Sequence, residues 1–221
     1  MILLNTGIYT VPEASRLSEV APSRIRRWMS GYRCKGKTYE RYWVGQLPKM
    51  EGKQAVGFLD LIELRFMHFF LAQGVSLQRI KQVHQALQHR HGISHPFSTG
   101  QYGTDRVNIL EQAADELGER LWVNVTSGQA ELKFVEQFIH QLDFGSDSLA
   151  ARWWPRGRDN LVVLDPQRNF GKPMLASCGV PTRAIITALR ANDTVEAVAE
   201  WYEVSIAEVQ AALEFERSLA A

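Results

Sequence analysis

The length, composition and charge of the chain limit what kind of protein it can be. Its 221 residues, of which 45% are hydrophobic and 22% charged, can bury a sizeable core in one or two compact domains, and the formal net charge is +1. The longest apolar stretch, residues 66–72, is interrupted by His68 and is far too short to span a bilayer, and the N-terminus lacks a signal-peptide pattern. We therefore expect an ordered, cytoplasmic protein with no membrane partner.

A short helix is predicted over residues 10–17. Thr10 suits the N-cap position, and Glu13 follows three residues later, which is the spacing of a capping box. Ala14 and Leu17 then lie on one side of the helix and form an apolar face. We expect this face to pack on a second short helix.

The second helix is predicted over residues 22–29. Ile25, Trp28 and Met29 have the i, i+3, i+4 spacing that places them on one inward face. The basic side chains are then displaced to the outer side, where guanidinium groups can contact phosphates and guanine edges. The residues that we expect to contact DNA from this helix are Ser23, Arg24, Arg26 and Arg27.

The loop that follows, residues 30–53, is basic and aromatic. It contains six lysines and arginines against two glutamates. Residues 39–44 and 46–50 are predicted to pair as a small antiparallel wing, with Gly45 near the turn. An ordinary surface loop is the alternative, because basic clusters alone are weak motifs. A wing would place cations on the phosphate backbone beside the groove, and the candidates are Arg33, Lys35, Lys37 and Arg41.

The residues that carry these patterns resemble a known DNA-binding fold. Residues 7–28 are similar to the start of a MerR-type winged helix, and residues 56–65 and 74–80 are similar to its second helix pair. Ala21 stands where that family usually has a capping serine. The resemblance implies a winged helix-turn-helix domain over residues 1–95 that binds double-stranded DNA.

Cysteine and histidine spacing does not indicate a metal site. Cys34 and Cys178 stand far apart, and neither has a second thiolate or imidazole at ligand spacing. His84, His91 and His95 approach helical spacing, but Gly92 and Pro96 break the helix there. We expect these histidines to lie at a solvated helix end, and we expect no metal and no cofactor.

Charge is divided unequally along the chain. Residues 1–95 contain 14 lysines and arginines against 6 aspartates and glutamates, whereas residues 96–221 contain 11 against 18. Only the first part has the electrostatic character of a DNA-binding protein. The acidic remainder is expected to favour a protein or small-molecule partner.

Residues 96–160 are predicted to form a small α+β connecting region. It begins in a linker over residues 91–105 that is rich in glycine, serine and threonine. Strand-like pieces follow at residues 107–110 and 121–125, and an amphipathic run covers residues 132–142. This region is a candidate surface for dimerisation or for a partner protein.

Adjacent tryptophans flanked by arginines mark residues 152–158. Trp and Arg anchor many protein interfaces, so the segment is a candidate partner-binding patch. The alternative is a strand in which one tryptophan is buried and the other is partly covered by an arginine stem. The residues concerned are Arg152, Trp153, Trp154, Arg156 and Arg158.

The last sixty residues predict a short strand and three helices. The strand covers residues 161–164, and the helices cover residues 181–189, 194–202 and 205–217. The last helix begins with a capping box of Ser205 and Glu208 and is acidic along its length until Arg217, which disfavours groove reading. We therefore expect a protein–protein role, including dimerisation, for this block.

This block resembles a small helical domain of bacterial antitoxins. The similarity covers residues 161–217 and includes Gly171-Lys172-Pro173 and Val180-Pro181-Thr182. The resemblance implies a VapB-type antitoxin that binds and silences a PIN-like ribonuclease toxin. It also implies an autorepressor that binds the operator of its own promoter. In such a complex, an arginine of residues 152–158 could enter the carboxylate centre of the nuclease. We expect a homodimer, because one winged helix reads only a half-site.

An alternative function is that of a ligand-responsive MerR-type regulator. Trp122, Phe134 and Phe138 would then line a small-molecule pocket, although core packing also explains them. We find no nucleophile elbow, P-loop, dinucleotide fingerprint or zinc-hydrolase motif, and therefore expect no enzyme and no catalytic residues. The expected fold class is mainly α with small β elements (α+β), in three domains at residues 1–95, 96–160 and 161–221.

Overall fold

A computed structural model describes residues 5–72, 74–100, 138–191 and 194–220. The chain divides into two compact units, and neither is continuous in sequence. The N-terminal unit comprises Tyr9–His140 and Phe144–Ala150, and the C-terminal unit comprises Met1–Ile8, Gln141–Asp143 and Ala151–Ala221. The boundaries predicted at residues 95 and 160 rest on composition and stay a prediction.

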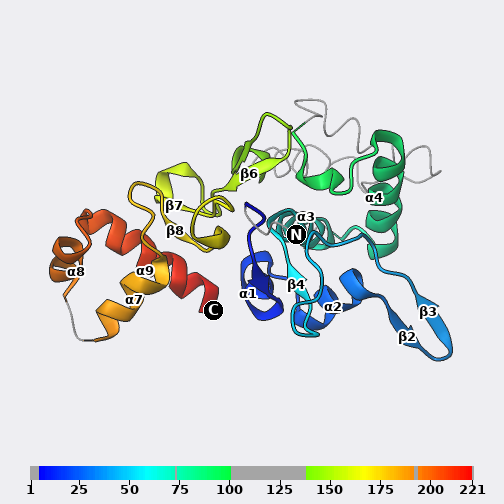
Figure 1. Ribbon diagram of the computed structural model, residues 1–221, viewed down its shortest axis with the longest axis horizontal. Helices are drawn as coiled ribbons and strands as arrows, with labels where there is room; N and C mark the ends of the chain where they lie inside the picture. The colour runs from blue at the N-terminus through cyan, green and yellow to red at the C-terminus, as the bar shows by residue number, and fades with distance from the viewer. Residues whose placement is uncertain (1–4, 73, 101–137, 192–193, 221) are drawn as a thin grey trace. The chain divides into compact units, whose positions relative to one another are not determined.

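Helices dominate the N-terminal unit (Figure 1). Its elements, in chain order, are β1 (Tyr9–Thr10), α1 (Val11–Ser18), α2 (Pro22–Ser30), β2 (Tyr32–Cys34), β3 (Lys37–Tyr39), β4 (Ala55–Val56), α3 (Phe58–Ala72), α4 (Leu77–His91) and the 3-10 helix η1 (Pro96–Ser98). Strand β1 pairs with β4, and β2 pairs with β3, both antiparallel. The two sheets hold the ends of the segment between α2 and α3.

The two short helices predicted near the start of the chain are confirmed. Thr10 caps α1: its side chain accepts the Glu13 backbone N–H at 3.3 Å, and the Glu13 carboxylate accepts the Thr10 N–H at 2.8 Å. Ala21 at the N-cap of α2 makes no side-chain cap bond. Helix α2 places Ile25, Trp28 and Met29 in the core, as its spacing predicts.

Helix α3 is the buried centre of the N-terminal unit. It packs against α1, α4 and η1, and its side chains are apolar on nearly every side. Phe66 is the middle of an aromatic cluster, with ring centroids 4.9 Å from Phe70 and from Phe97 and 5.5 Å from Phe138. Burial of such rings contributes a large part of the stability of a core. Phe138, which the pocket hypothesis uses, is therefore a core residue, whereas Trp122 and Phe134 lie outside the described residues.

The hairpin predicted over residues 39–50 is wrong in its position. The hairpin is formed by β2 and β3, with Tyr32 opposite Tyr39 and Cys34 opposite Lys37. Its two-residue turn is Lys35-Gly36, in which both φ angles are positive, at 49° and 76°. Such mirror-image turns match the twist of a hairpin, and glycine adopts them without steric cost.

The C-terminal unit contains a three-helix group and small sheets. Strand β5 (Leu142–Phe144) contributes its first two residues to this unit, and its partner β6 (Ala150–Trp153) contributes its last three. The other described elements are η3 (Arg158–Asn160), β7 (Val162–Val163), η4 (Asn169–Gly171), β8 (Met174–Leu175), α7 (Thr182–Arg190), α8 (Val195–Trp201) and α9 (Ile206–Ala220). Strands β7 and β8 are antiparallel. The strand and the three helices predicted for this region are confirmed.

Helix α9 forms the core of the three-helix group. It packs against α7 and α8 and buries Val209, Ala212 and Phe215. The predicted capping box is present: Ser205 and Glu208 exchange hydrogen bonds of 2.8 and 3.2 Å with each other's backbone N–H groups. A cap of this kind fixes the direction in which the chain enters a helix.

The expected fold class, mainly α with small β elements, is confirmed by helices and two-stranded sheets in both units. The strand-like pieces at residues 107–110 and 121–125, and the amphipathic run up to residue 137, lie outside the described residues. No described helix combines the length and the hydropathy that a bilayer crossing requires.

Candidate nucleic-acid interface

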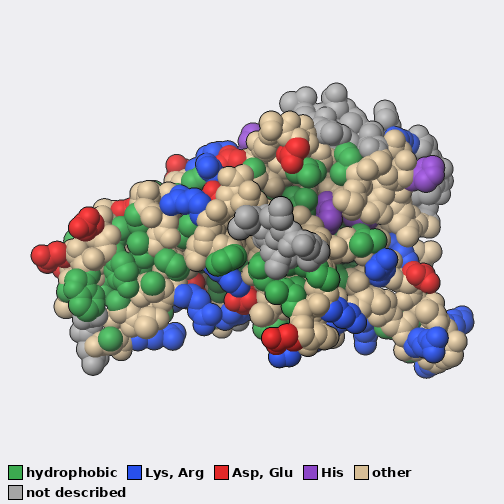
Figure 2. Space-filling model, viewed as in Figure 1, with side chains coloured by type: hydrophobic (Ala, Val, Ile, Leu, Met, Phe, Trp, Pro, Cys, Tyr) green, Lys and Arg blue, Asp and Glu red, His purple; other side chains and the backbone are tan. Residues whose placement is uncertain are grey.

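The outer face of α2 and the β2–β3 hairpin form one exposed basic surface, which we call the basic face. Every residue predicted to contact DNA is exposed on it: Ser23, Arg24, Arg26, Arg27, Arg33, Lys35, Lys37 and Arg41. Figure 2 shows Lys and Arg side chains gathered over β2 and β3. Among the described residues, none of these seven cations is in an ion pair. Their charge is therefore available to an anionic partner.

Stacked side chains join α2 to the hairpin. The guanidinium carbon of Arg27 lies 5.2 Å from the ring centroid of Tyr32. Tyr32 in turn stacks on its cross-strand partner Tyr39, with ring centroids 4.6 Å apart and an angle of 6° between the rings. A cation over an aromatic face is held by the ring quadrupole and keeps its hydrogen-bond donors free. The stack therefore fixes where Arg27 lies without using its N–H groups.

The backbone at both ends of the hairpin is also held. Tyr42 N–H donates to the Trp28 carbonyl at 2.7 Å, which ties the segment after the hairpin to α2. Gly31, between α2 and β2, has a φ of +70°, and a Cβ there would lie 2.6 Å from the Tyr39 carbonyl oxygen. Only glycine fits this close approach of two backbone segments. The hairpin therefore leaves α2 in one defined direction.

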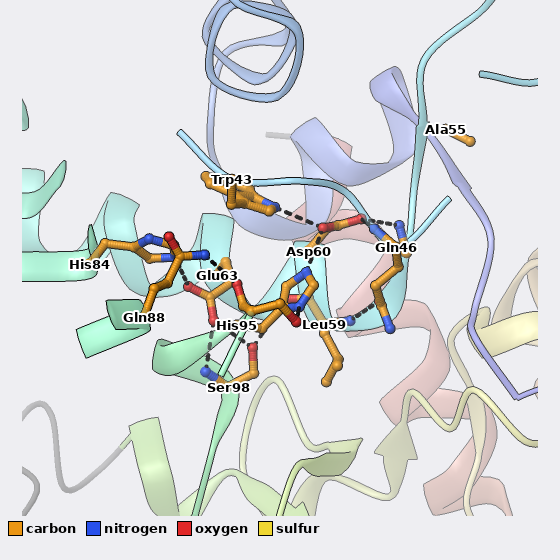
Figure 3. A network of polar contacts seen from close by, with 12 residues as sticks. Trp43, Gln46, Ala55, Leu59, Asp60, Glu63, His84, Gln88, His95 and Ser98 are labelled. Atoms are coloured by element: carbon orange, nitrogen blue, oxygen red, sulfur yellow. Dashed lines mark hydrogen bonds and ion pairs between the residues drawn. The ribbon is translucent and has the colours of Figure 1, made fainter. Parts of the chain in front are cut away.

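Asp60 anchors the segment between the hairpin and α3 (Figure 3). This carboxylate is fully buried. Its Oδ1 accepts the Trp43 indole N–H at 2.8 Å and faces His95 Nε2 at 2.9 Å. Its Oδ2 accepts the backbone N–H groups of Gln46 at 3.1 Å and Gly57 at 2.9 Å. A carboxylate has about four acceptor sites, and all four are used here.

Glu63, one helical turn after Asp60, forms a second buried centre in Figure 3. Its Oε2 lies 2.9 Å from His84 Nε2, and its Oε1 accepts the Ser98 hydroxyl at 2.7 Å and the Ser98 backbone N–H at 2.9 Å. These bonds hold α4 and η1 on α3. The Asp60 and Glu63 centres, which we call the carboxylate network, therefore support the basic face from the interior.

The expectation that the histidines lie at a solvated helix end is wrong for two of them. His84 and His95 are buried and face the carboxylates of α3, whereas the side chain of His91 lies outside the described part. A buried imidazole needs a hydrogen-bond partner, and the acids inside an apolar helix supply it. Among the described residues, no group of three His, Cys, Asp or Glu side chains is placed to hold a metal ion.

Stability is expected to depend on pH through His95. Burial lowers the pKa of His95, but the hydrogen bond to Asp60 and the charges of Asp60 and Glu63 raise it, and the net pKa lies above 6.5. The folded protein therefore holds this proton more tightly than the unfolded chain, so the stabilisation is complete below pH 6.5 and is lost as pH rises through the raised pKa. We predict that His95→Gln loses more unfolding free energy at about pH 5.5 than at about pH 9, measured by urea unfolding.

The matched variant for this experiment is His68→Gln. Burial, followed by the charge of Arg65, lowers the pKa of His68 below its ordinary value. Its contribution to stability should therefore change with pH in the opposite direction. Equal stability losses for His95→Gln at both pH values would contradict the role assigned to His95.

The Trp-Arg segment of residues 152–158 is largely occupied by contacts within its own unit. Trp153 is buried, with 1% of its surface exposed, and Trp154 donates its indole N–H to Asp143 at 3.0 Å. Arg158 pairs with Asp143 and lies 5.7 Å from the Trp154 ring centroid. Of the two arrangements considered for this segment, the structure has the strand in which one tryptophan is buried and the other lies beside an arginine.

The remaining two arginines of the Trp-Arg segment differ in their surroundings. Arg152 Nε donates to Asp165 at 3.1 Å. Arg156 is exposed and forms no ion pair with any described residue. Of the three arginines considered for contact with a partner, Arg156 has the most freedom to make one.

Sequence reasoning did not find the carboxylate network. The signal was present, because Asp60 and Glu63 stand three residues apart inside an apolar helix, where a charged side chain requires a buried partner. The partners could not be named, because His95 and Ser98 lie 35 residues away from the acids that they contact.

Three comparisons place the chain among known proteins. The family model described as "Protein of unknown function (DUF433)" matches residues 162–215. A protein of Mycobacterium tuberculosis described as "Putative antitoxin VapB45" is 30% identical over an alignment of 222 positions, and the alignment covers 94% of this chain and 92% of that protein. The crystal structure of Rv2018 from Mycobacterium tuberculosis is similar with a TM-score of 0.74 and 25% identity, and the match covers 95% of this chain and 99% of that one.

Proposed function

The chain belongs to the antitoxin family of this mycobacterial relative, and from this premise we propose that it binds and neutralises a PIN-like ribonuclease toxin and represses its own promoter. The proposal has two parts that can fail separately. The first is DNA binding by residues 1–95 in a MerR-like manner. The second is toxin binding by the acidic remainder of the chain. A relative named as an antitoxin supports a toxin partner most directly.

The observation that carries the DNA-binding part is the basic face. Its seven cations are exposed and without ion pairs among the described residues, and the stack on Tyr32 orders one of them before any DNA arrives. Side chains that are ordered in the free protein lose less conformational entropy when they bind. We propose that α2 enters the major groove with Arg24 and Arg27, and that the hairpin cations lie on phosphates.

The test is the salt dependence of binding to the promoter DNA that precedes the gene. Each phosphate contact contributes about −0.9 to the slope of log affinity against log salt. The three hairpin cations Arg33, Lys35 and Lys37, together with Arg41 directly after the hairpin, should therefore contribute a slope of about −3.6. The control is DNA of equal length from within a coding region. Binding that is equally weak to both DNAs and independent of salt would contradict this part of the proposal.

The aromatic stack leads to a prediction about Tyr32. Tyr32→Leu removes the ring under Arg27 and should weaken binding to promoter DNA about two- to five-fold, because exposed cation–π contacts contribute about 0.5–1 kcal/mol. The salt slope should not change, since no phosphate contact is removed. Fluorescence anisotropy with labelled promoter DNA measures both quantities. Tyr32→Phe keeps the ring and should bind as the wild type does; a Tyr32→Phe protein as weak as Tyr32→Leu would assign the effect to the hydroxyl group instead.

The toxin-binding part rests on the antitoxin relative and on the acidic charge of residues 96–221. Co-expression with the neighbouring reading frame should give a stable complex and should restore growth that the neighbour alone arrests. Within this part, Arg156 is the arginine that we propose for contact with a carboxylate centre in the toxin. Absence of both a complex and rescue would remove the toxin-binding part and leave the DNA-binding part intact. We propose a homodimer on a palindromic operator for the complete repressor.

A further inference from the structure

The corner between α8 and α9 exposes two large apolar side chains in the C-terminal unit. Trp201 is 73% exposed and Ile206 is 45% exposed, and no other large hydrophobic side chain in the described part of the chain has a larger exposed fraction than Trp201. The Trp201 indole N–H has no hydrogen-bond acceptor among the described residues. An exposed tryptophan adds little to the stability of the chain, and Trp is a residue type that is enriched at protein interfaces.

Hydrogen bonds on both sides of the corner hold its backbone, although its apolar side chains face outward. Thr194 caps α8 by accepting the Ala197 N–H at 3.1 Å, and Val198 and Ala199 turn the other face of α8 into the core. The chain then turns with Val204 N–H donating to the Ala199 carbonyl at 2.9 Å, directly before the capping box at Ser205. Trp201 and Ile206 are therefore presented on a fixed backbone. A fixed presentation lowers the entropy lost when a partner binds.

Exposed acidic residues lie near these two residues in the sequence. Glu196, Glu200 and Glu203 are exposed, and residues 195–220 contain six glutamates and one arginine. Figure 2 shows acidic side chains beside hydrophobic ones over α8. An apolar centre with a charged rim is the arrangement of a specific protein interface, in which Trp is a frequent hot spot.

We propose that Trp201 and Ile206, with the rim of Glu196, Glu200 and Glu203, form the main docking surface for the toxin. The matching surface on the toxin is an apolar pocket bordered by lysines and arginines, into which the Trp201 indole inserts. This inference rests on the toxin-binding part of the proposed function and names the residues that perform it. The rim steers association by its charge, and the indole slows dissociation.

Charge also decides against other occupants of this surface. In a two-fold dimer of the chain through this corner, each glutamate rim would face an identical one, and like charges placed opposite each other repel. DNA carries the same sign of charge as the rim and is excluded for the same reason. A basic protein partner is the occupant that complements both the apolar centre and the rim.

The test is Trp201→Ala in the full-length chain, with the purified protein from the neighbouring reading frame as the probe. Removal of a hot-spot side chain should weaken the complex at least about 30-fold, measured by biolayer interferometry or calorimetry. The melting temperature and the affinity for promoter DNA should stay unchanged, since Trp201 is exposed. Phe170→Ala, which removes a 63% exposed ring elsewhere in the same unit, is the matched control and should leave toxin affinity unchanged.

A second pair of variants tests the rim. Glu200→Lys with Glu203→Lys should slow association about tenfold at low salt, and the effect should shrink at high salt. Glu200→Lys alone and Glu214→Lys alone change the net charge equally, and Glu214→Lys, which is exposed outside the corner, should slow association less. Wild-type affinity in Trp201→Ala, or loss of self-association instead of toxin binding, would overturn the inference while leaving the proposed function in place. Failure of the wild-type chain to bind the probe would remove the toxin-binding part and this inference together.

Discussion

Replacing Asp60 by alanine is expected to lower the free energy of unfolding by about 3–5 kcal/mol, which is the range for removing one partner of a buried charged pair. The carboxylate is fully buried and is bonded to four groups at 2.8–3.1 Å. Its removal leaves the Trp43 indole, two backbone N–H groups and His95 without a partner in the core. Each such group loses its bond to water on folding and gains nothing in return.

Urea unfolding followed by circular dichroism measures this effect. Asp60→Asn distinguishes the loss of the negative charge from the loss of side-chain volume. The amide has the size of the carboxylate, but its nitrogen cannot accept hydrogen bonds from the N–H groups on that side. We expect it to be destabilised as well, though less than the alanine variant. Glu40→Ala, an exposed change in the same unit, is the control. A loss below about 1 kcal/mol for Asp60→Ala would contradict the idea that this residue anchors the segment behind the hairpin.

The largest expected effect on DNA binding comes from removing Arg24 and Arg27 together. Both are exposed on the outer face of α2, opposite the buried Ile25 and Trp28. A bidentate contact between arginine and a guanine contributes about 1–3 kcal/mol to base discrimination. The double alanine variant should therefore bind its promoter at least about 30-fold more weakly, while its affinity for unrelated DNA falls much less.

Gel-shift titration with promoter and unrelated DNA measures this difference. The control is Arg183→Ala with Arg190→Ala on α7, two exposed arginines of the C-terminal unit whose removal changes the net charge equally. This control should bind promoter DNA nearly as the wild type does. An equal loss in both double variants would show that net charge, and not α2, carries the affinity.

Local patterns predicted the helices, because their information is contained in a few neighbouring residues. Thr10 with Glu13 and Ser205 with Glu208 mark two helix starts, and the spacing of Ile25, Trp28 and Met29 marks an inward face. Each of these signals is complete within one turn of helix. The corresponding structures depend little on the rest of the chain.

The hairpin was displaced because tertiary contacts decide the segment that follows it. Residues 40–54 contain the aromatic residues that favour strands, but Trp43 and Leu47 point into the core and Asp60 binds the backbone of the segment. The turn uses Lys35 in a conformation that lysine seldom adopts, so composition gave no signal there. Likewise, no local pattern specifies that an imidazole 35 residues away will meet Asp60.

The stack of Arg27, Tyr32 and Tyr39 has a consequence for how recognition changes among relatives. The stacked rings join α2 to the hairpin. The distance between the α2 side chains that contact bases and the hairpin side chains that contact phosphates is therefore fixed. If α2 alone were transferred to a relative, its arginines would lack the tyrosine rings of the hairpin that position Arg27. Operator preference should therefore transfer between homologues only when residues 22–41 are exchanged as a single cassette.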